Sequence, residues 1–310
     1  MSRNWGHPRS SGDTDRRAAA LVVGAAVLWG TTGTAQALGP DGASTIAVGA
    51  ARNVVGALVL VGIAAIRGRL TTGVRGLPRR PLLLAAGATA SYQLCFFGGV
   101  RLAGVAIGTV VGVGSGPVWG GLLGWVGRGE RPSRRWGIAT SLAMVGAALL
   151  ATSASGDTGE VDPLGIALAL GAGLSYAAFA LWAKALTDRN DPDLVMTWVF
   201  LLSALALLPL GLGAGAGPLL SVEGLAMALW LGCVSLAAAY LLFGRGIAGV
   251  TVATATTLSL AEPVTAAALG IVVLDERLTA AAVAGILLVF AGLAALASSG
   301  SRRRGLPPDL

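Results

Sequence analysis

Two stretches of this chain carry the pattern that decides its fold. Residues 102–131 read LAGVAIGTVVGVGSGPVWGGLLGWVGRGER, and residues 247–277 read IAGVTVATATTLSLAEPVTAAALGIVVLDER. Each stretch begins with an Ala-Gly-Val run at its second residue, contains one proline (Pro117 and Pro263) and ends on Glu-Arg. Each also holds an apolar run of about 20 residues, the length that an α-helix needs to cross a bilayer. We therefore expect a membrane protein with an internal repeat.

The repeat extends beyond these two stretches at a spacing of about 146 residues. Chance similarity between apolar helices is common, but several polar and proline pairs at nearly one spacing favour a true duplication. The matched sets are Leu102-Ala103-Gly104-Val105 with Ile247-Ala248-Gly249-Val250, Gly116-Pro117 with Glu262-Pro263, Glu130-Arg131 with Glu276-Arg277, Gly146 with Gly292, and Leu28-Trp29-Gly30 with Ser175-Tyr176-Ala177.

The composition agrees with a membrane protein. The chain has 310 residues, of which 55% are hydrophobic and only 12% are charged, and 47 more are glycine. So few charges cannot coat the surface of a water-soluble protein of this size. An ordinary soluble enzyme, a disordered chain and a disulfide-rich secreted domain are therefore excluded. Because lipid tolerates no open strand edge, we expect an all-α polytopic membrane protein.

Ten apolar segments are long enough to span the bilayer and are separated by short turns with glycine, proline or charge. We expect two five-helix repeats, 18–152 and 163–298, with an external linker at 153–162 and cytoplasmic tails at 1–17 and 299–310. The expected spans are 18–38, 43–66, 81–101, 104–126, 135–152, 163–186, 193–211, 223–244, 249–274 and 278–298.

The placement of basic residues gives the orientation. With the N-terminus inside, 19 of the 22 Lys and Arg residues fall in cytoplasmic segments, whereas Arg101 and Arg277 fall outside and Arg52 lies within a span. This asymmetry follows the positive-inside rule. We expect a multi-pass protein of the plasma membrane with both termini in the cytoplasm, and the net charge of +7 requires no nucleic-acid partner.

Five spans per half is an odd number, so the two copies enter the membrane in opposite directions. The charge of the matched loops agrees, because Arg128, Arg131, Arg134 and Arg135 follow the fourth span whereas Arg277 alone follows the ninth. An inverted repeat gives a protein two similar arrangements, each open to one face of the membrane. The sequence therefore predicts a 5+5 inverted repeat and a secondary transporter that works by alternating access.

The same residues resemble the paired EamA domains of the drug/metabolite transporter superfamily. The resemblance rests on 103–146 and its copy 248–292, together with Leu28-Trp29-Gly30-Thr31 and Ala51-Arg52-Asn53. It implies a ten-helix 5+5 bundle and a central cavity for a small metabolite. The family includes exporters of amino acids and metabolites, drug exporters and some importers, so the resemblance favours export and leaves import or exchange as the alternative.

Two charges lie near the centre of predicted spans, Arg52 in the second and Glu262 in the ninth. A charge at that depth costs about 2.5–3.5 kcal/mol on insertion scales, so each side chain needs a partner or a wet cavity. One alternative is a structural ion pair between the two. The other is that they contact substrate, with Arg52 on a carboxylate and Glu262 on an ammonium or a coupling proton. An amino acid-like or an amphipathic cationic compound suits this pair.

Further polar and aromatic residues lie on faces that can line the cavity. At the period of an α-helix, Thr254 and Thr265 share one arc with Glu262 on the ninth span. Packing is the alternative role for every aromatic residue in this set. The remaining candidates are Trp29, Gln36, Gln93, Trp119, Tyr176 and Tyr240.

Three other features concern bends in helices, helix ends and close packing. Pro117 and Pro263 bend their spans and are candidate hinges, with static kinks as the alternative. Glu130 and Glu276 are expected to cap the helix that follows each of them, with substrate gating as the alternative. In the fourth span, glycine at every fourth position forms a stripe that favours close packing within the chain or, alternatively, a homodimer seam. The stripe consists of Gly108, Gly112, Gly116, Gly120 and Gly124.

Several classes of function find no support in the residues. No cluster fits a metal site or a catalytic cofactor, and the G-x-x-x-x-G-K-[ST] run of ATP-hydrolysing proteins does not occur. A membrane-embedded enzyme needs a metal, a Ser/His pair or several clustered carboxylates, and Glu262 is the one carboxylate in the interior of the expected spans. The expected partners are a small-molecule substrate, protons as a coupling ion and the lipid bilayer, for a monomer or a homodimer.

Overall fold

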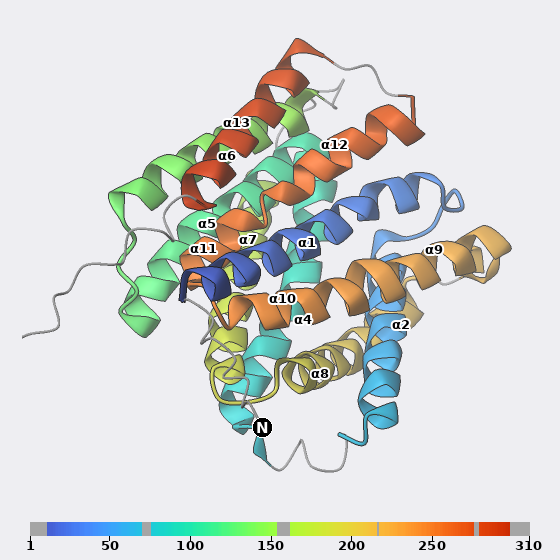
Figure 1. Cartoon of the computed structure of the whole chain (residues 1–310). Helices are drawn as coiled ribbons and strands as arrows, with labels where there is room; N and C mark the ends of the chain where they lie inside the picture. The colour runs from blue at the N-terminus through green and yellow to red at the C-terminus, as the bar shows by residue number, and fades with distance from the viewer. Residues whose placement is uncertain (1–10, 70–75, 154–161, 216, 276–278, 298–310) are drawn as a thin grey trace, which may run out of the picture.

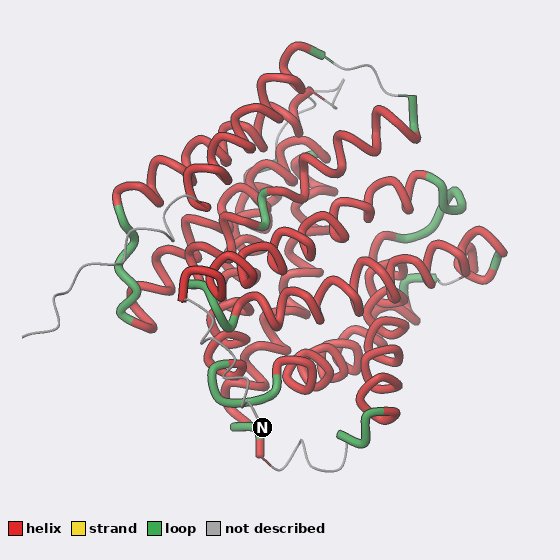
Figure 2. Tube along the Cα trace, in the orientation of Figure 1, coloured by secondary structure: helices red, strands yellow, loops and turns green. Residues whose placement is uncertain are grey.

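The computed structural model describes residues 11–69, 76–153, 162–215, 217–275 and 279–297. In these residues the chain is helical, with short turns between helices and no strand (Figures 1 and 2). Residues 1–10 of the expected N-terminal tail, the whole of the expected C-terminal tail, most of the linker and the pair Glu276-Arg277 lie outside the described residues.

The helices of the two halves follow the expected order of spans. In the second half, two rods are built from more than one helical piece, α9 with η3 and α10, and α11 with α12. The first half contains α1 (Ser11–Ala37), α2 (Thr45–Ile66), α4 (Arg79–Ala103), α5 (Val105–Arg128) and α6 (Arg134–Ser153). The second half contains α7 (Pro163–Thr187), α8 (Pro192–Gly213), η2 (Gly217–Leu220), α9 (Val222–Gly232), η3 (Cys233–Ala238), α10 (Ala239–Ile247), α11 (Val252–Leu258), α12 (Ala261–Val273) and α13 (Ala280–Ala297).

Eight of these rods have the length and hydropathy of a membrane span within the described residues. They are α1, α2, α4, α5, α7, α8, the rod α9–α10 and the rod α11–α12. A shorter apolar helix covers Ala280–Leu296, and α6 falls outside the set of eight. The protein is thus an all-helical membrane protein, and α6 and α13 lie where the fifth and tenth spans are expected.

The long apolar stretch of the first half divides into two helices at Gly104. This residue has φ +82°, a backbone conformation that strongly favours glycine, and it ends α4 and begins α5. The reversal lets α5 fold back on α4, because Gly108 presents only hydrogen where a Cβ would lie 2.7 Å from Val100 Cα. The expected boundary between the third and fourth spans is therefore present.

The packing repeats between the halves. Helix α4 packs against α7, and the counterpart rod α9–α10 packs against α1. Likewise α5 packs against α7, and the rod α11–α12 packs against α1. The pairs α2–α8, α5–α11 and α6–α13 join each element to its own counterpart, and Figure 1 shows α6 and α13 side by side. Exchanging the halves therefore preserves the pattern of contacts.

Local structure repeats in the same way. Helices α2 and α8 both have 22 residues and begin 147 residues apart. The Oγ of Ser133 accepts from the backbone N–H of Trp136 at the start of α6, and the Oγ1 of Thr279 accepts from that of Ala282 at the start of α13, both at 3.1 Å. The two capping residues stand 146 positions apart, at the spacing of the sequence repeat.

Glycine permits the closest of these contacts. Between α6 and α13, a Cβ on Gly146 would lie 2.6 Å from the carbonyl oxygen of Gly285, and a Cβ on Gly292 would lie 2.5 Å from that of Ala139. The backbones therefore meet without intervening side chains, as small residues allow between membrane helices.

The glycine stripe of α5 faces neighbours in the same chain. Gly112 lies against Phe96 of α4, Gly116 against Tyr176 of α7, and Gly120 against Thr256 of α11. At these positions the stripe thus allows close packing within the chain, which is the first of the two roles expected from the sequence.

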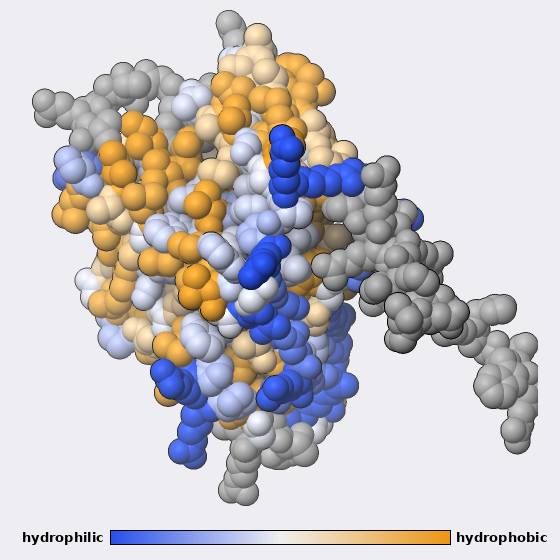
Figure 3. Space-filling view, turned by 90° about the vertical axis from the view of Figure 1, so that its left-hand side faces the viewer, coloured by the Kyte–Doolittle hydropathy of each residue, from blue (hydrophilic) through white to orange (hydrophobic). Residues whose placement is uncertain are grey.

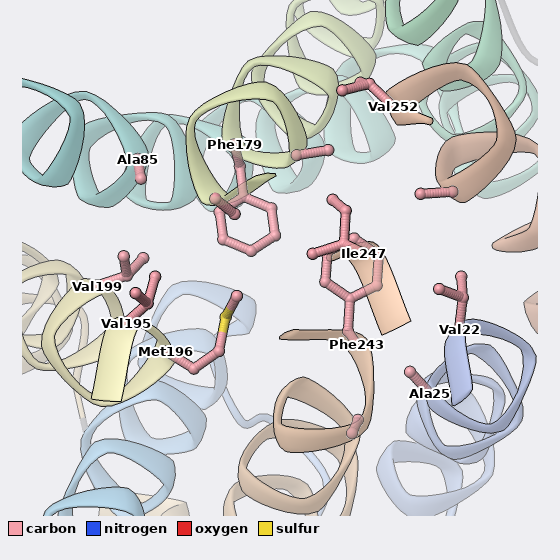
Figure 4. Close-up of a cluster of buried hydrophobic side chains, with 14 of the residues drawn as sticks. Val22, Ala25, Ala85, Phe179, Val195, Met196, Val199, Phe243, Ile247 and Val252 are labelled. Atoms are coloured by element: carbon pink, nitrogen blue, oxygen red, sulfur yellow. The ribbon is translucent and has the colours of Figure 1, made fainter. Parts of the chain in front are cut away.

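A buried apolar core ties the second half to α1 and α4. In Figure 4, Phe179, Phe243, Ile247 and Met196 fill the space between their helices, and Val22 of α1 closes the cluster from another side. Outside the core the chain exposes many large apolar side chains, as lipid contact requires. Figure 3 shows hydrophilic residues gathered in a band beside a largely hydrophobic surface.

We predict that Gly146→Ala lowers the thermal stability of the purified protein in detergent, by about 3 °C or more, since overpacking costs about 1–3 kcal/mol. Gly137→Ala in the same helix is the matched control, because a Cβ there meets nothing within 4 Å. A melting temperature equal in the two variants would contradict the described α6–α13 contact.

Candidate functional site

A pocket lies at the centre of the bundle. It is bordered by residues of α1, α2, α4, α5, α7, α8, the rod α9–α10 and the rod α11–α12, so both halves of the chain contribute to it. Its empty space, including the part open to solvent, is about 680 Å³. Both intramembrane charges, Arg52 and Glu262, line this pocket. Each of the two charges thus has access to a cavity rather than only to lipid.

Arg52 is held on one side by a local irregularity in the facing helix. Its Nη2 donates to the carbonyl oxygen of Ser235 at 3.1 Å, and its Nε is buried without a hydrogen-bond partner. Ser235 lies in the π-helical turn η3, and its Oγ pairs with Thr32 Oγ1 of α1 at 2.7 Å. Such π-turns are often found at functional sites. The guanidinium therefore has a fixed position and retains a donor for another molecule.

Glu262 stands in the first turn of α12, next to an interruption of the ninth rod. The rod breaks at Ser259-Leu260, and Pro263 supplies no backbone N–H to bond the carbonyl of Ser259. The partial positive charge at a helix N-terminus favours a carboxylate there. Within the described residues, the carboxylate has no hydrogen-bond partner and forms no ion pair with Arg52.

Aromatic side chains form much of the wall. Trp29, Tyr176 and Tyr240, all expected at the cavity, line it, with the Trp29 ring 5.0 Å from Tyr240 and 6.2 Å from Tyr176 between centroids. The sequence analysis missed Tyr92 and Phe200, which also line it. Tyr92 lies 6.3 Å from Tyr176, so the rings form a continuous aromatic surface beside the two charges.

Polar groups complete the wall. Tyr176 Oη pairs with Ser259 Oγ at 2.5 Å, which links α7 to the end of α11. Gln93 is 7% exposed, faces the pocket and has no side-chain hydrogen bond in the described part of the chain. Trp29 Nε1 is likewise buried without a partner. These groups add free donors and an amide oxygen to the pocket.

Four expected site residues do not line the pocket. Gln36 donates to the carbonyl oxygen of Thr32 on its own helix, and Trp119 lies half-buried on α5. Thr254 pairs with Thr251 at the start of α11, and Thr265 lies where Gly30 of α1 approaches α12. Thr254 is separated from Glu262 by the break at Ser259-Leu260, whereas Thr265 follows Glu262 by three residues in α12 and shares its side of that helix without lining the pocket.

The residues on the pocket side of α11 are instead Thr256 and Ser259. The sequence analysis missed both. Ser259 precedes Glu262 by three residues and would lie near its face on an unbroken helix as well, so the miss arises because the spacing of polar residues does not show which side of a rod faces the pocket.

The two candidate hinge prolines differ in their surroundings. Pro263 adjoins the break between α11 and α12, whereas Pro117 lies inside α5, which is one continuous helix. The second repeat is therefore the irregular one, with both the π-turn and the break facing the pocket.

The expected role of Glu130 needs a correction. Its Oε2 accepts from the backbone N–H of Val252 at 2.9 Å, so it caps α11 of the other repeat instead of the following helix α6. The cause is Gly129, which has φ +69° and turns the chain back over the end of α5. Glu276 lies outside the described residues.

The arrangement can recognise a small molecule that carries both charges. Arg52 offers charged donors suited to a carboxylate. Glu262 and the electron-rich faces of the neighbouring rings suit a cation.

Comparisons with known proteins agree with the repeat. The model of the family described as "EamA-like transporter family" matches residues 16–152 and again 163–298. A protein of Bacillus subtilis (strain 168) named uncharacterized transporter YwfM is 38% identical over 284 residues, which are 92% of this chain and 95% of that protein. A crystal structure with 18% sequence identity covers 90% of this chain and 96% of its own, with a TM-score of 0.78, and shares the fold.

We predict that Arg52→Met leaves the melting temperature unchanged or raises it, because an apolar side chain removes the cost of a charge without an ion pair. Arg245→Met is the matched control and lowers it, since Arg245 donates to both carboxylate oxygens of Asp193, at 2.8 and 2.7 Å. Thermal unfolding in detergent measures both. A larger drop in melting temperature for Arg52→Met than for Arg245→Met would show that Arg52 stabilises the fold.

Proposed function

Because the chain belongs to the EamA-like transporter family, we propose that it is a secondary transporter that moves one small metabolite across the plasma membrane by alternating access. Family membership makes it a multi-pass membrane transporter rather than an enzyme. The observation that carries the finer proposal is the central pocket, where Arg52 and Glu262 face one cavity built from both repeats.

The proposed topology is a ten-helix 5+5 inverted repeat with both termini in the cytoplasm. Eight rods have the properties of spans, and α6 and α13 occupy corresponding places at the ends of the two repeats. The contact pattern that survives exchange of the halves supports a two-fold relation between them. The cytoplasmic side is assigned from the basic residues that follow α2 and α5.

The proposed substrate is amino acid-like or an amphipathic cation. A zwitterion suits both ends of the pocket, with its carboxylate on Arg52 and its ammonium on Glu262 and the aromatic wall. A cation without a carboxylate uses only the second part of the site. Arg52 therefore distinguishes the two substrate classes, because only the zwitterion has a carboxylate for it to bind.

Energy for transport is proposed to come from protons that exchange at Glu262. A carboxyl group that faces the cavity can take up a proton on one side of the membrane and release it on the other. We propose export as the direction on family resemblance alone, with import or exchange by the same fold as the alternative. The monomer is favoured because α5 uses its glycine stripe within the chain.

The direct test of function is uptake into reconstituted vesicles. Amino acids and cationic drugs are screened with and without an imposed proton gradient, and counterflow is measured for each compound that is transported. Saturable counterflow is the expected result. Transport that neither saturates nor shows counterflow would identify a channel and contradict the proposal.

We predict that Glu262→Gln lowers proton-coupled flux by at least tenfold, because an amide cannot carry the proton. The variant protein is still expected to fold. Glu223→Gln on the exposed first turn of α9 is the control and leaves the flux unchanged. Flux of the Glu262→Gln variant with the pH dependence of the parent would refute the proton role.

We also predict that Arg52→Met changes selectivity. Binding of a zwitterionic amino acid weakens by about tenfold or more, because a charge-assisted bidentate contact with its carboxylate is lost. Binding of the ester of the same amino acid, which has no carboxylate, changes little. Competition in the vesicle assay measures both compounds. If binding of the two compounds weakened equally, the substrate carboxylate would not be bound by Arg52.

A further inference from the structure

A chain of four charged side chains lies at the end of the bundle where α5 and α7 end. Arg128 Nε pairs with Glu130 Oε1 at 2.9 Å, and Arg128 Nη2 pairs with Asp188. Asp188 in turn pairs with Lys184 Nζ at 3.4 Å. The four side chains are only 10–31% exposed. This chain of charges therefore joins the first repeat, through α5, to the second, through α7.

Both ends of this chain of charges hold the turn between α10 and α11. Lys184 Nζ donates to the carbonyl oxygens of Ile247 and Ala248, at 3.1 and 3.4 Å, at the C-terminus of α10. Glu130 Oε2 accepts from Val252 N at the N-terminus of α11. Each charge has the sign that the helix end favours. The turn is thus held from two sides by opposite charges.

The surroundings of Glu130 suit a contact that can form and break. Gly124 of α5 makes room for this contact, because a Cβ there would lie 3.1 Å from Glu130 Oε2 and 3.5 Å from Val252 Cβ. The contact consists of an ionic hydrogen bond at the edge of water rather than interlocked apolar side chains. A small separation of α11 from α5 is therefore enough to break it.

Helix α11 leads directly from this contact to the pocket. Four residues after Val252 comes Thr256, and then Ser259, which both line the pocket. The break before α12 follows, and Glu262 stands just beyond it. Because α11 is a separate short helix, a shift at Ser259 or Glu262 can move its N-terminus.

We propose that Glu130 and Lys184 form a latch on the α10–α11 turn that keeps this face of the transporter closed and must release for the pocket to open there. The proposal rests on the proposed alternating-access function. It assigns Glu130 a role in gating and not only in capping α11. Glu130 joins the first repeat to this turn, and Lys184 holds the turn within the second repeat, so relative motion of the repeats that opens that face breaks the Glu130 contact.

Thiol labelling of the pocket tests the latch without knowledge of the substrate. The parent for the test carries Thr89→Cys in the pocket, with Cys95→Ser and Cys233→Ala removing both native cysteines. A membrane-impermeant maleimide is applied to either face, in cells and in everted vesicles. If the parent labels from one face only, the alternating-access function fails. Labelling of the parent from both faces is the result that the alternating-access function predicts.

We predict that Glu130→Ala raises the labelling rate from the Glu130 face by about tenfold, since losing a charge-assisted hydrogen bond shifts a two-state equilibrium by about that factor. Labelling from the opposite face falls. Asp162→Ala is the matched control, because Asp162 Oδ1 also accepts from a helix N–H, that of Leu164 at 2.8 Å, but caps only its own helix. Equal rates in parent, Glu130→Ala and Asp162→Ala would overturn the latch alone.

A disulfide provides a second test if Glu130→Ala does not fold. The Cβ separation between positions 124 and 252 suits a disulfide. With Gly124→Cys and Val252→Cys together, oxidation is expected to suppress labelling of position 89 from the Glu130 face by at least fivefold, and prior reduction to restore it. Each single cysteine variant should respond to neither treatment. A disulfide that forms and leaves labelling unchanged would overturn the latch.

Discussion

The constraint on which the structure depends is the cost of holding two opposite charges inside a membrane. Each costs about 2.5–3.5 kcal/mol unless it reaches water or a partner. Arg52 and Glu262 meet this constraint by facing one central pocket, where a carbonyl of a π-turn holds the guanidinium and a helix N-terminus supports the carboxylate. Both irregularities of the backbone lie beside a charge. The remaining helices enclose the pocket and expose their apolar faces to lipid.

The two repeats share their packing but not their local detail. Equivalent pairs of helices make equivalent contacts, and glycine allows their backbones to meet. The second repeat alone has a π-turn and a broken span in its described residues, and both face the pocket. The first repeat contributes the continuous helix α5 and the carboxylate of Glu130. The symmetric packing thus supplies the frame, and the irregular turns of the second repeat add to a site that both repeats line.

Much of this could be predicted from the sequence, because apolar runs and charges within them are strong signals in lipid. The helices, the turn at Gly104, the family and the two pocket charges follow from such signals. Tyr92, Phe200 and Ser259 were missed because composition does not show which side of a span faces inward. Thr254 was misplaced for the same reason, and Thr265 because sharing a side of α12 with Glu262 does not bring a residue into the pocket. The partner of Glu130 lies 122 residues away in sequence, beyond any local capping rule.

The central claim is that the two repeats cross the membrane in opposite directions. Ser133 and Thr279 cap corresponding helices and are both exposed, so they report on the two repeats at matched positions. In a background without native cysteines, Ser133→Cys and Thr279→Cys are labelled separately with an impermeant maleimide in intact cells and in everted vesicles. The account predicts that Ser133→Cys labels only in everted vesicles and Thr279→Cys only in intact cells. Labelling of both positions from the same face would contradict it.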